Sequence, residues 1–326
     1  MDKVKVILDV DTGSDDAVAI IAALLSPELE IMGIATVNGN RCVEYTTENT
    51  LRIVELLKSS VPVYKGCQFP VCSTLLGRRP DIPKREDTLQ NEVHSKFLDM
   101  CPPAESKEED LNAVSWYVKT LMSMEDHSVT LISLGPMTNI ANAIAIEPRI
   151  VPKIKEIICM AGGFKINNRT AAAEYNVWID PESYEIVLNA NIAKITIVPL
   201  DATHDAYLTA EDAAEFRTMN TPVSNVVAEL VERRIKGYAD LQSIGVENAA
   251  PIHDPLCVLA LLEPAILTEV IPAHCAVDIG DGAAYGQTVF NIKNGRVEVQ
   301  EPNCYVALSA DSEKFRHMMH RILERS

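Results

Sequence analysis

The chain has 326 residues, 47% hydrophobic and 23% charged, so it is long and apolar enough to bury a sizeable core. Its formal net charge is −17, and no basic stripe offsets it, which argues against a surface that binds nucleic acid or an anionic membrane. The eight cysteines are scattered without a C-x-x-C pair, and they indicate neither a disulfide framework nor a zinc site.

The first apolar run is short, flanked by charges and broken by Asp9, which is typical of a strand and not of a signal peptide. No later run approaches the length of a membrane span. We therefore expect a cytoplasmic protein with neither membrane nor nucleic-acid partners.

Apolar runs alternate with amphipathic stretches along the first two thirds of the chain. Predicted strands lie at 4–10, 30–37, 129–134, 156–160 and 193–200, and predicted helices run over 15–25, 43–57 and 136–146 and begin again after Pro181. The strands are rich in Val, Ile and Leu without polar alternation, which indicates burial on both faces. The βαβα order predicts an α/β fold, a mainly parallel Rossmann-like open sheet with helices on both faces.

Two regions depart from this alternation. Residues 66–106 carry several prolines and mixed charge, and we expect a long loop there. Residues 209–254 are predicted to be helical and to form a cap beside the site. We find no internal repeat or linker, so we expect a single domain over 1–326.

The segments that follow the predicted strands are rich in Gly, Asn or acidic residues. They read DVDTGSDD at 9–16, NGN at 38–40, LGPMTN at 134–139, and MAGGF at 160–164 followed by NNRTAAAEYN at 167–176. Ligands of open α/β sheets bind beyond the carboxyl ends of the strands. This convergence predicts a polar site at that edge of the sheet.

The aspartates at 9, 11, 15 and 16 crowd four carboxylates around a bend at Gly13. A purely structural interpretation is available, because acids are favoured at the start of a helix. An EF-hand loop does not fit, because Ser14 and Ile20 occupy the positions that need Gly and Glu. A dehalogenase-like phosphohydrolase is a less favoured alternative, since Thr12 comes one residue too early for its motif.

The string D-V-D-T-G-S-D-D-A closely resembles the signature of the inosine–uridine nucleoside hydrolase family. Other blocks resemble that family in the same order, and they are VNGN at 37–40, LGPMTNIA at 134–141, MAGGF at 160–164, N-x5-E-x-N at 168–176 and PIHDP at 251–255. Together they cover nearly the whole chain.

The resemblance implies a Ca²⁺ ion held by oxygen ligands alone. These would be Asp11, Asp16, Asp254 and the backbone carbonyl of Leu134. It also implies a set of residues that bind the substrate. Asp15 would accept a hydrogen bond from a ribose hydroxyl and Asn40 would help to place a water molecule, while the remainder of the set is Met160, Asn168, Glu174, Asn176 and again Asp254.

Two residues carry the implied catalysis. Asp11 would be the general base that activates water, and His253 would be the general acid for the leaving base, since an unperturbed histidine pKa near about 6.5 suits proton donation at neutrality. On its own, a His before Asp-Pro is more often a residue at a helix start without chemistry. His317 and His320 are predicted to lie on a surface face, and the sequence assigns no place to His94.

The resemblance implies calcium-dependent hydrolysis of the N-glycosidic bond of ribonucleosides, giving ribose and free base for nucleoside salvage, by a homodimer or homotetramer. Many family members carry a His-Gly motif followed by Gly-Leu after the third strand, and residues 77–97 show no obvious counterpart. The choice between purine and pyrimidine bases is therefore open, with Tyr238 or another aromatic residue in 235–248 as a candidate to stack on the base. A catalytically silent calcium- or nucleoside-binding protein is the alternative from another functional class.

Overall fold

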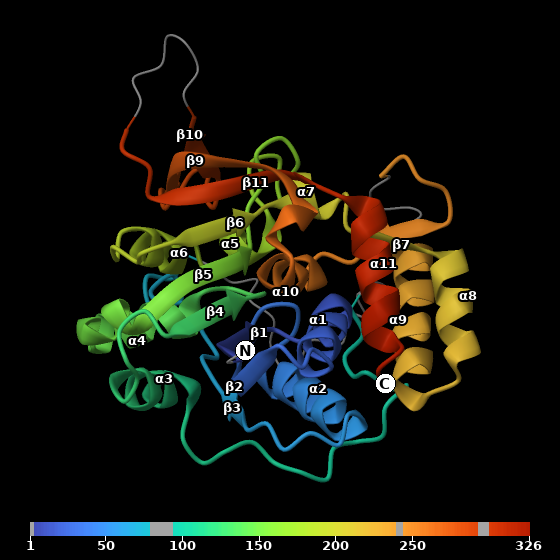
Figure 1. The fold of residues 1–326 in the computed structure, drawn as a ribbon. Coiled ribbons are helices and arrows are strands. Elements are labelled where there is room, and N and C mark those ends of the chain that lie inside the picture. Colours follow the sequence, from blue (N-terminus) through green and yellow to red (C-terminus); the bar gives the residue numbers. More distant parts are fainter. Residues whose placement is uncertain (1–2, 79–93, 239–243, 293–299) are drawn as a thin grey trace.

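The computed structural model describes residues 3–78, 94–238, 244–292 and 300–326 (Figure 1). In these residues nine strands form one sheet, in the order β10-β9-β11-β6-β5-β4-β1-β2-β3. Every pair from β11 to β3 is parallel, and β9 and β10 add an antiparallel edge. The predicted fold class, a mainly parallel α/β sheet, is confirmed.

The strands of this sheet are β1 (Val4–Val10), β2 (Leu29–Thr36), β3 (Val63–Lys65), β4 (Val129–Ser133), β5 (Ile154–Met160), β6 (Ile195–Val198), β9 (Leu267–Val277), β10 (Thr288–Asn291) and β11 (Cys304–Ala310). The helices around it are α1 (Ser14–Leu24), α2 (Val43–Leu56), α3 (Ala113–Met122), α4 (Thr138–Ile146), α5 (Tyr175–Ile179), α6 (Pro181–Leu188), α7 (Leu200–Thr203), α10 (Pro255–Leu262) and α11 (Ser312–Leu323). Each element that the sequence predicted between residues 4 and 200 is present, with its ends moved by a few residues.

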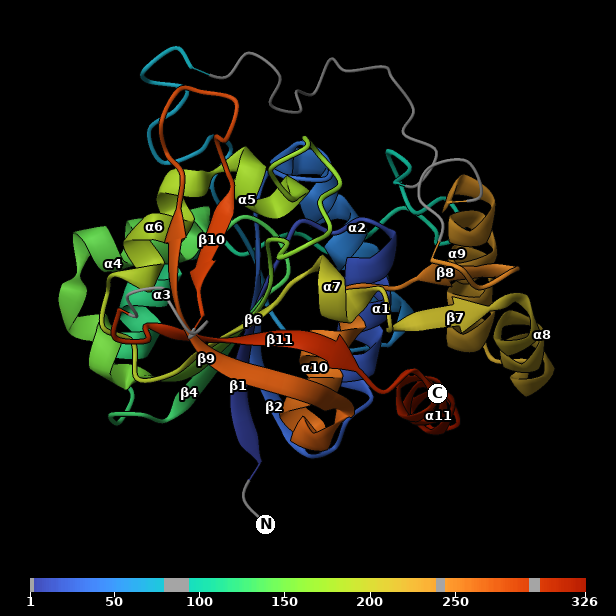
Figure 2. The same cartoon turned by 90° about the horizontal axis from the view of Figure 1, so that it is seen from above.

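Helices cover both faces of the sheet because both faces are apolar. Along β1, Val6, Leu8 and Val10 join the core that contains residues of α1 and α10, whereas Ile7 points into a second core with residues of α3 and α4. Figure 2 shows α3, α4 and α6 on one side of the sheet and α1 and α10 on the other. This two-sided burial explains why the strands lack alternation of polar and apolar residues.

The region 209–254 is largely helical, as predicted, with α8 (Ala210–Met219) and α9 (Pro222–Tyr238). The sequence analysis did not predict the two-stranded antiparallel sheet of β7 (Tyr207–Thr209) and β8 (Ala249–Pro251) that joins its two ends. Helix α9 packs against α1 and so reaches the carboxyl edge of the main sheet. Residues 239–243, part of the segment expected to supply an aromatic side chain, lie outside the described residues.

The long loop predicted over 66–106 is confirmed in its described parts, which contain turns and no helix or strand. Side chains at the starts of helices α4 and α6 anchor it, because Asn139 Oδ1 accepts from Cys67 N at 2.8 Å and Asp180 Oδ2 accepts from Val71 N at 3.0 Å. Residues 79–93 of this loop lie outside the described residues. The loop returns to the body where Leu98 N donates to Asn49 Oδ1 at 3.0 Å.

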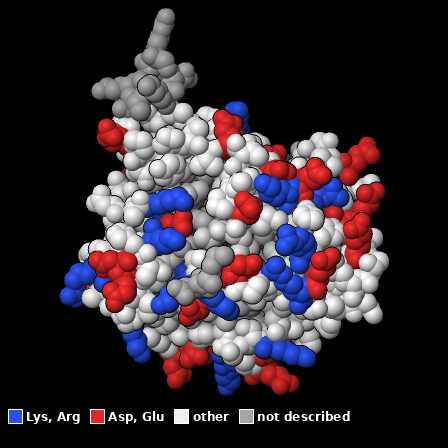
Figure 3. Space-filling model, in the orientation of Figure 1, with Lys and Arg blue, Asp and Glu red and all other residues white. Residues whose placement is uncertain are grey.

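The face of the molecule in Figure 3 carries acidic and basic side chains interspersed, so the net negative charge does not collect in one patch there. Among the helices of the described residues, none combines the length and the apolarity that crossing a bilayer requires.

Candidate active site

The turn after β1 is closed by the side chain of Asp16. Its Oδ2 accepts from Gly13 N at 2.9 Å and its Oδ1 accepts from Asp11 N at 3.2 Å, at the point where α1 begins. Asp9 lies behind the turn, where it accepts hydrogen bonds from Tyr117 Oη at 2.9 Å and from Asn139 Nδ2 at 3.2 Å. Asp9 therefore supports the turn from inside the protein.

Asp11 is fully buried in a cage of backbone and amide groups. Asn40 N donates to its Oδ2 at 2.6 Å, and Asn40 Nδ2 donates at 3.2 Å both to Asp11 Oδ1 and to Asp16 Oδ2. Gly39 and Gly135 approach so closely that a Cβ at either residue would come within 2.0 Å and 2.8 Å of the Asp11 carboxylate. The glycines after β2 and β4 therefore leave the room that Asp11 occupies.

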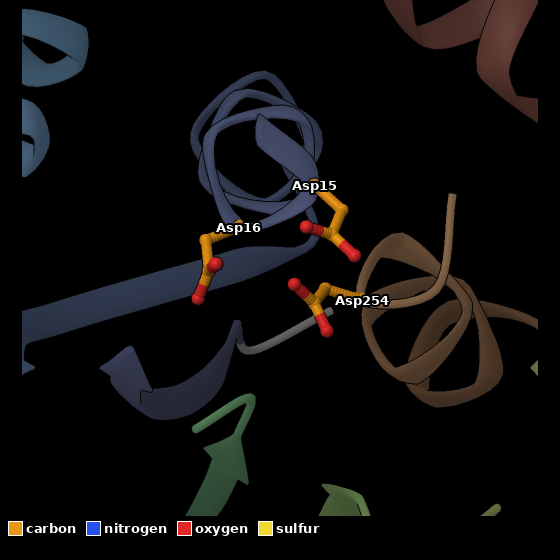
Figure 4. Close-up of side chains that lie close together, drawn as sticks. All are labelled: Asp15, Asp16 and Asp254. Atoms are coloured by element: carbon orange, nitrogen blue, oxygen red, sulfur yellow. The ribbon is translucent and has the colours of Figure 1, made fainter. Parts of the chain in front are cut away.

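Three carboxylates converge beside this cage. Oxygens of Asp15 and Asp16, at the start of α1, and of Asp254, at the start of α10, lie within 4.8 Å of one another, and Figure 4 shows the three side chains directed toward a common centre. Each residue is at most 5% exposed. Hard oxygen donors in such a cluster suit a cation of the Ca²⁺ type.

Burial and repulsion between carboxylates raise the pKa of Asp11, Asp16 and Asp254. Burial is the largest cause for all of them, and neighbouring carboxylates add to it, so that the pKa of Asp16 rises to about 6 and those of Asp11 and Asp254 rise further above their usual range. A dication at this point would offset the repulsion and keep the groups ionised. The residues present therefore fit a metal ion.

Asp15 differs from its neighbours because a buried cation faces it. Arg234 Nη1 lies 3.0 Å from Asp15 Oδ1, and His94 Nδ1 lies 3.9 Å from the same oxygen. Burial by itself would raise the pKa of Asp15, but the positive charge of Arg234, the largest of the opposing causes, holds that pKa below the usual range. Asp15 is thus ionised and paired within the protein before any ligand binds.

The segment that was expected to hold ribose folds around the start of α5. Glu174 caps this helix, accepting from Asn176 N at 2.8 Å and from Val177 N at 3.2 Å, and it also accepts from Gly162 N at 3.0 Å. Burial raises the pKa of Glu174 to about 7.

Two neighbouring asparagines are held by the backbone. Asn176 Nδ2 donates to the carbonyls of Leu134 at 2.8 Å and Met160 at 3.1 Å, so the carbonyl expected to bind metal already accepts one hydrogen bond. Asn168 is exposed at the rim, and its Oδ1 accepts from Tyr175 N at 2.9 Å.

His253 is held at both ring nitrogens. Its Nδ1 pairs with Thr203 Oγ1 at 2.7 Å, and its Nε2 pairs with the Tyr238 hydroxyl at 2.8 Å. Burial first, and then the charge of Arg234, lower the pKa of His253 well below its usual range. The assumption of an unperturbed pKa was therefore wrong, and in this structure His253 is a neutral imidazole at neutral pH.

A cavity of about 760 Å³ joins these groups at the carboxyl ends of the strands. Nine of the predicted site residues line it, namely Asp15, Asn40, Leu134, Met160, Asn168, Glu174, Asn176, His253 and Asp254. Asp11 and Asp16 are fully buried and lie in hydrogen-bond contact with the lining residue Asn40.

The cavity also contains side chains for which the sequence predicted no catalytic or binding role. His94, unassigned above, accepts from Ser14 N through Nδ1 at 3.3 Å, and burial lowers its pKa to about 4. Arg234 lines the cavity from α9, beside the proposed stacking residue Tyr238.

Of the two histidines expected on a surface face, His317 is exposed, but His320 is partly buried with Nε2 at 2.9 Å from Asp212, so that prediction was wrong for His320.

Comparisons with known proteins agree with this geometry. The sequence model of the family described as inosine-uridine preferring nucleoside hydrolase matches residues 6–317. The chain is 33% identical to the inosine-uridine preferring nucleoside hydrolase of Crithidia fasciculata, over 98% of each chain, and 33% identical to the pyrimidine-specific ribonucleoside hydrolase RihA of Escherichia coli, over 95% of each. Among solved structures, it is similar to a purine-preferring ribonucleoside hydrolase from Gardnerella vaginalis, with a TM-score of 0.84, 29% identity and 98% of each chain covered.

Proposed function

The chain belongs to the inosine-uridine preferring nucleoside hydrolase family and is an enzyme that hydrolyses the N-glycosidic bond of ribonucleosides, and from this premise we propose that it does so with Ca²⁺, releasing ribose and free base for nucleoside salvage. The observation that carries the calcium proposal is the cluster of buried carboxylates at the cavity. A phosphohydrolase of the dehalogenase type is excluded by the family match.

Asp11, Asp16, Asp254 and the Leu134 carbonyl would hold the ion. Asp15 is an alternative ligand for the ion, because its carboxylate belongs to the cluster that it forms with Asp16 and Asp254. Its pairing with Arg234 at 3.0 Å supports a different part for it, as the acceptor for a ribose hydroxyl. When bound, calcium supplies positive charge that lowers the pKa of a water molecule beside it.

Asp11 would take the proton from that water. Its carboxylate is held at both oxygens by Asn40, which fixes its orientation before substrate arrives. The Asn40 side chain also reaches the cavity and would position the water. Attack at the anomeric carbon then breaks the bond to the base, through a transition state with positive charge on the sugar ring that nearby carboxylates and amide oxygens stabilise.

The sugar would be held on the opposite wall by Asn168, Glu174 and Asn176, with Met160 against the ring and Asp254 touching a hydroxyl. The raised pKa of Glu174, about 7, means that its carboxyl can donate or accept a hydrogen bond near neutrality. These contacts give the site a preference for ribosides.

His253 would stabilise the departing base as its proton donor. Because burial lowers its pKa, the charged form is scarce at neutral pH but is a stronger acid than an ordinary imidazolium. The hydroxyl of Tyr238 lies 2.8 Å from Nε2 and would hold the imidazole in place for this role.

The test is an assay of released reducing sugar with inosine, uridine, adenosine, guanosine and cytidine. The protein is stripped with chelator and then supplied separately with Ca²⁺, Mg²⁺ or Zn²⁺. We expect activity to disappear on stripping and to return with Ca²⁺, whereas full activity after exhaustive stripping would eliminate the metal proposal. A catalytically silent binding protein would release no sugar from any of the five substrates.

We further propose a single domain over residues 1–326 with a helical cap over 209–254, in a cytoplasmic homodimer or homotetramer. The proposed assembly rests on the family resemblance. Light scattering coupled to size-exclusion chromatography tests the assembly, because a monomer at micromolar concentration would contradict it.

A further inference from the structure

Arg234 is a buried cation in the wall of the cavity, and its contacts join three parts of the site. Its Nε donates to Pro251 O at 2.9 Å, its Nη1 donates to Ser14 Oγ at 2.8 Å, and its Nη2 approaches the Tyr238 hydroxyl at 3.5 Å. Its exposed fraction is 0%.

The ion pair of Arg234 with Asp15 engages one carboxylate oxygen. Nη1 lies 3.0 Å from Asp15 Oδ1, a buried oxygen that accepts no hydrogen bond from the described part of the protein, so the attraction is one of charge and leaves Asp15 able to accept from a ligand in the cavity that it lines. A planar guanidinium bound at several nitrogens holds its partners in one geometry, which a flexible ammonium group does not. The orientation of Asp15 is therefore set from α9 and not only from its own helix.

The opposite side of Arg234 reaches the groups that face the leaving base. The guanidinium carbon lies 5.1 Å from the centre of the Tyr238 ring, and Tyr238 in turn contacts His253 Nε2 at 2.8 Å. The bond to Pro251 O ties Arg234 to the segment that ends in His253 and Asp254. A single side chain thus links the groups proposed for the sugar to those proposed for the base.

Burying a guanidinium among apolar groups is costly unless every donor finds a partner, and an apolar side chain of the same size would fill the space at lower cost. We infer that Arg234 is a positioning residue that fixes Asp15 for a ribose hydroxyl and thereby sets the preference of the enzyme for ribonucleosides over 2′-deoxyribonucleosides. This inference rests on the proposed role of Asp15. It predicts an effect on the choice of sugar that a general loss of stability would not produce.

The experiment compares kcat/KM for inosine and 2′-deoxyinosine in Arg234→Gln and Arg234→Lys, with enzyme in excess for the slower substrate. In Arg234→Gln we expect kcat/KM for inosine to fall by about 10- to 100-fold. The factor by which kcat/KM for 2′-deoxyinosine falls should be at least about ten times smaller, because that substrate lacks the hydroxyl that Asp15 accepts from. Arg234→Lys keeps the charge without the fork and should recover part of the preference.

Arg233→Gln is the matched control, because Arg233 is the next residue of α9 but is half-exposed and pairs with Asp99 and Glu229 away from the cavity. It should leave both values within about twofold of the wild type. Melting temperatures of all variants report whether the fold is retained.

A double-mutant cycle with Asp15→Asn gives a second measurement that does not need the 2′-deoxy substrate. If Arg234 acts through Asp15, Arg234→Gln should reduce kcat/KM for inosine much less in the Asp15→Asn background than in the wild type. Equal losses for both nucleosides, or additive losses in the cycle, would overturn the inference while leaving the proposed function in place. Failure of the wild type itself to cleave inosine would count against the proposed function instead.

Discussion

The close approach of Gly39 to Asp11 gives a prediction that separates catalysis from folding. In Gly39→Ala, the added Cβ would lie 2.0 Å from Asp11 Oδ2 and 2.7 Å from Asp11 Cγ, where an ordinary contact starts at 3.4 Å. Either the carboxylate moves by about 1.4 Å or the turn opens and loses the 2.6 Å bond from Asn40 N. Both movements take Asp11 out of the position in which it would act on water.

A displacement of about 1 Å at a catalytic group costs about 100-fold in rate, so we expect kcat to fall by at least that factor. The cost to folding is smaller, because one hydrogen bond contributes about 1 kcal/mol and the backbone at Gly39 needs no left-handed conformation. The melting temperature should therefore fall by only about 1 to 2 °C in a chain of this length.

The assay measures kcat for inosine and uridine beside the thermal transition. The control is Gly282→Ala, since a Cβ at Gly282 would have no atom within 4 Å and should change neither quantity. A folded Gly39→Ala protein with kcat within threefold of the wild type would refute the argument that the position of Asp11 limits turnover.

Three further predictions concern other groups. Asp11→Ala should reduce turnover by several orders of magnitude with the fold retained, as checked by circular dichroism, because it removes the proposed base that Asn40 holds at both oxygens. Tyr238→Phe removes the hydroxyl 2.8 Å from His253 Nε2 and should lower kcat about tenfold with little change in KM, measured under saturating inosine. Asp212→Asn weakens the contacts from Asp212 to Arg316 at 2.8 Å and His320 at 2.9 Å, and should cost about 2 kcal/mol in urea unfolding at pH 7. Burial of Asp212 acts to raise its pKa, but the hydrogen bonds from Arg316 and His320 outweigh burial and lower that pKa. The stability that the ionised carboxylate contributes is therefore complete above the unfolded pKa of about 4. The wild type and the variant should converge in stability as the pH falls below that value.

The sheet and most of the site could be predicted because their signals are local. Strands such as β1 and β5 are buried on both faces and read as unbroken apolar runs, and each polar segment follows its strand directly in the sequence. The antiparallel edge was missed because the first half of β9 is mostly exposed, buried residues occur only at alternate positions of its second half, and it includes Pro272, so it lacks such a run.

The partners of Asp15 could not be predicted from the sequence, because nothing local marks them. His94 follows a long loop and reaches Ser14 across 80 residues of sequence, and Arg234 lies 220 residues from Ser14 on a helix where a charged residue is usually solvated. Only tertiary packing turns these two side chains into neighbours of the cavity. The low pKa of His253 was missed for the same reason, since its burial depends on α9 and on Thr203.

The cavity residues come from different parts of the fold, and this affects how the nucleobase preference of the enzyme can change in evolution. Most groups proposed for water and sugar follow β1, β2, β4 and β5 of the sheet. The other lining residues, including His94, Arg234, Tyr238, His253 and Asp254, come from the two regions that interrupt the alternation of strands and helices. Replacements in those regions that spare Arg234, Tyr238, His253 and Asp254 would retune the choice of nucleobase without disturbing bond cleavage. Relatives whose names specify inosine and uridine, pyrimidines or purines all share about a third or somewhat less of their sequence with this chain, as expected if base preference evolves on a conserved catalytic frame.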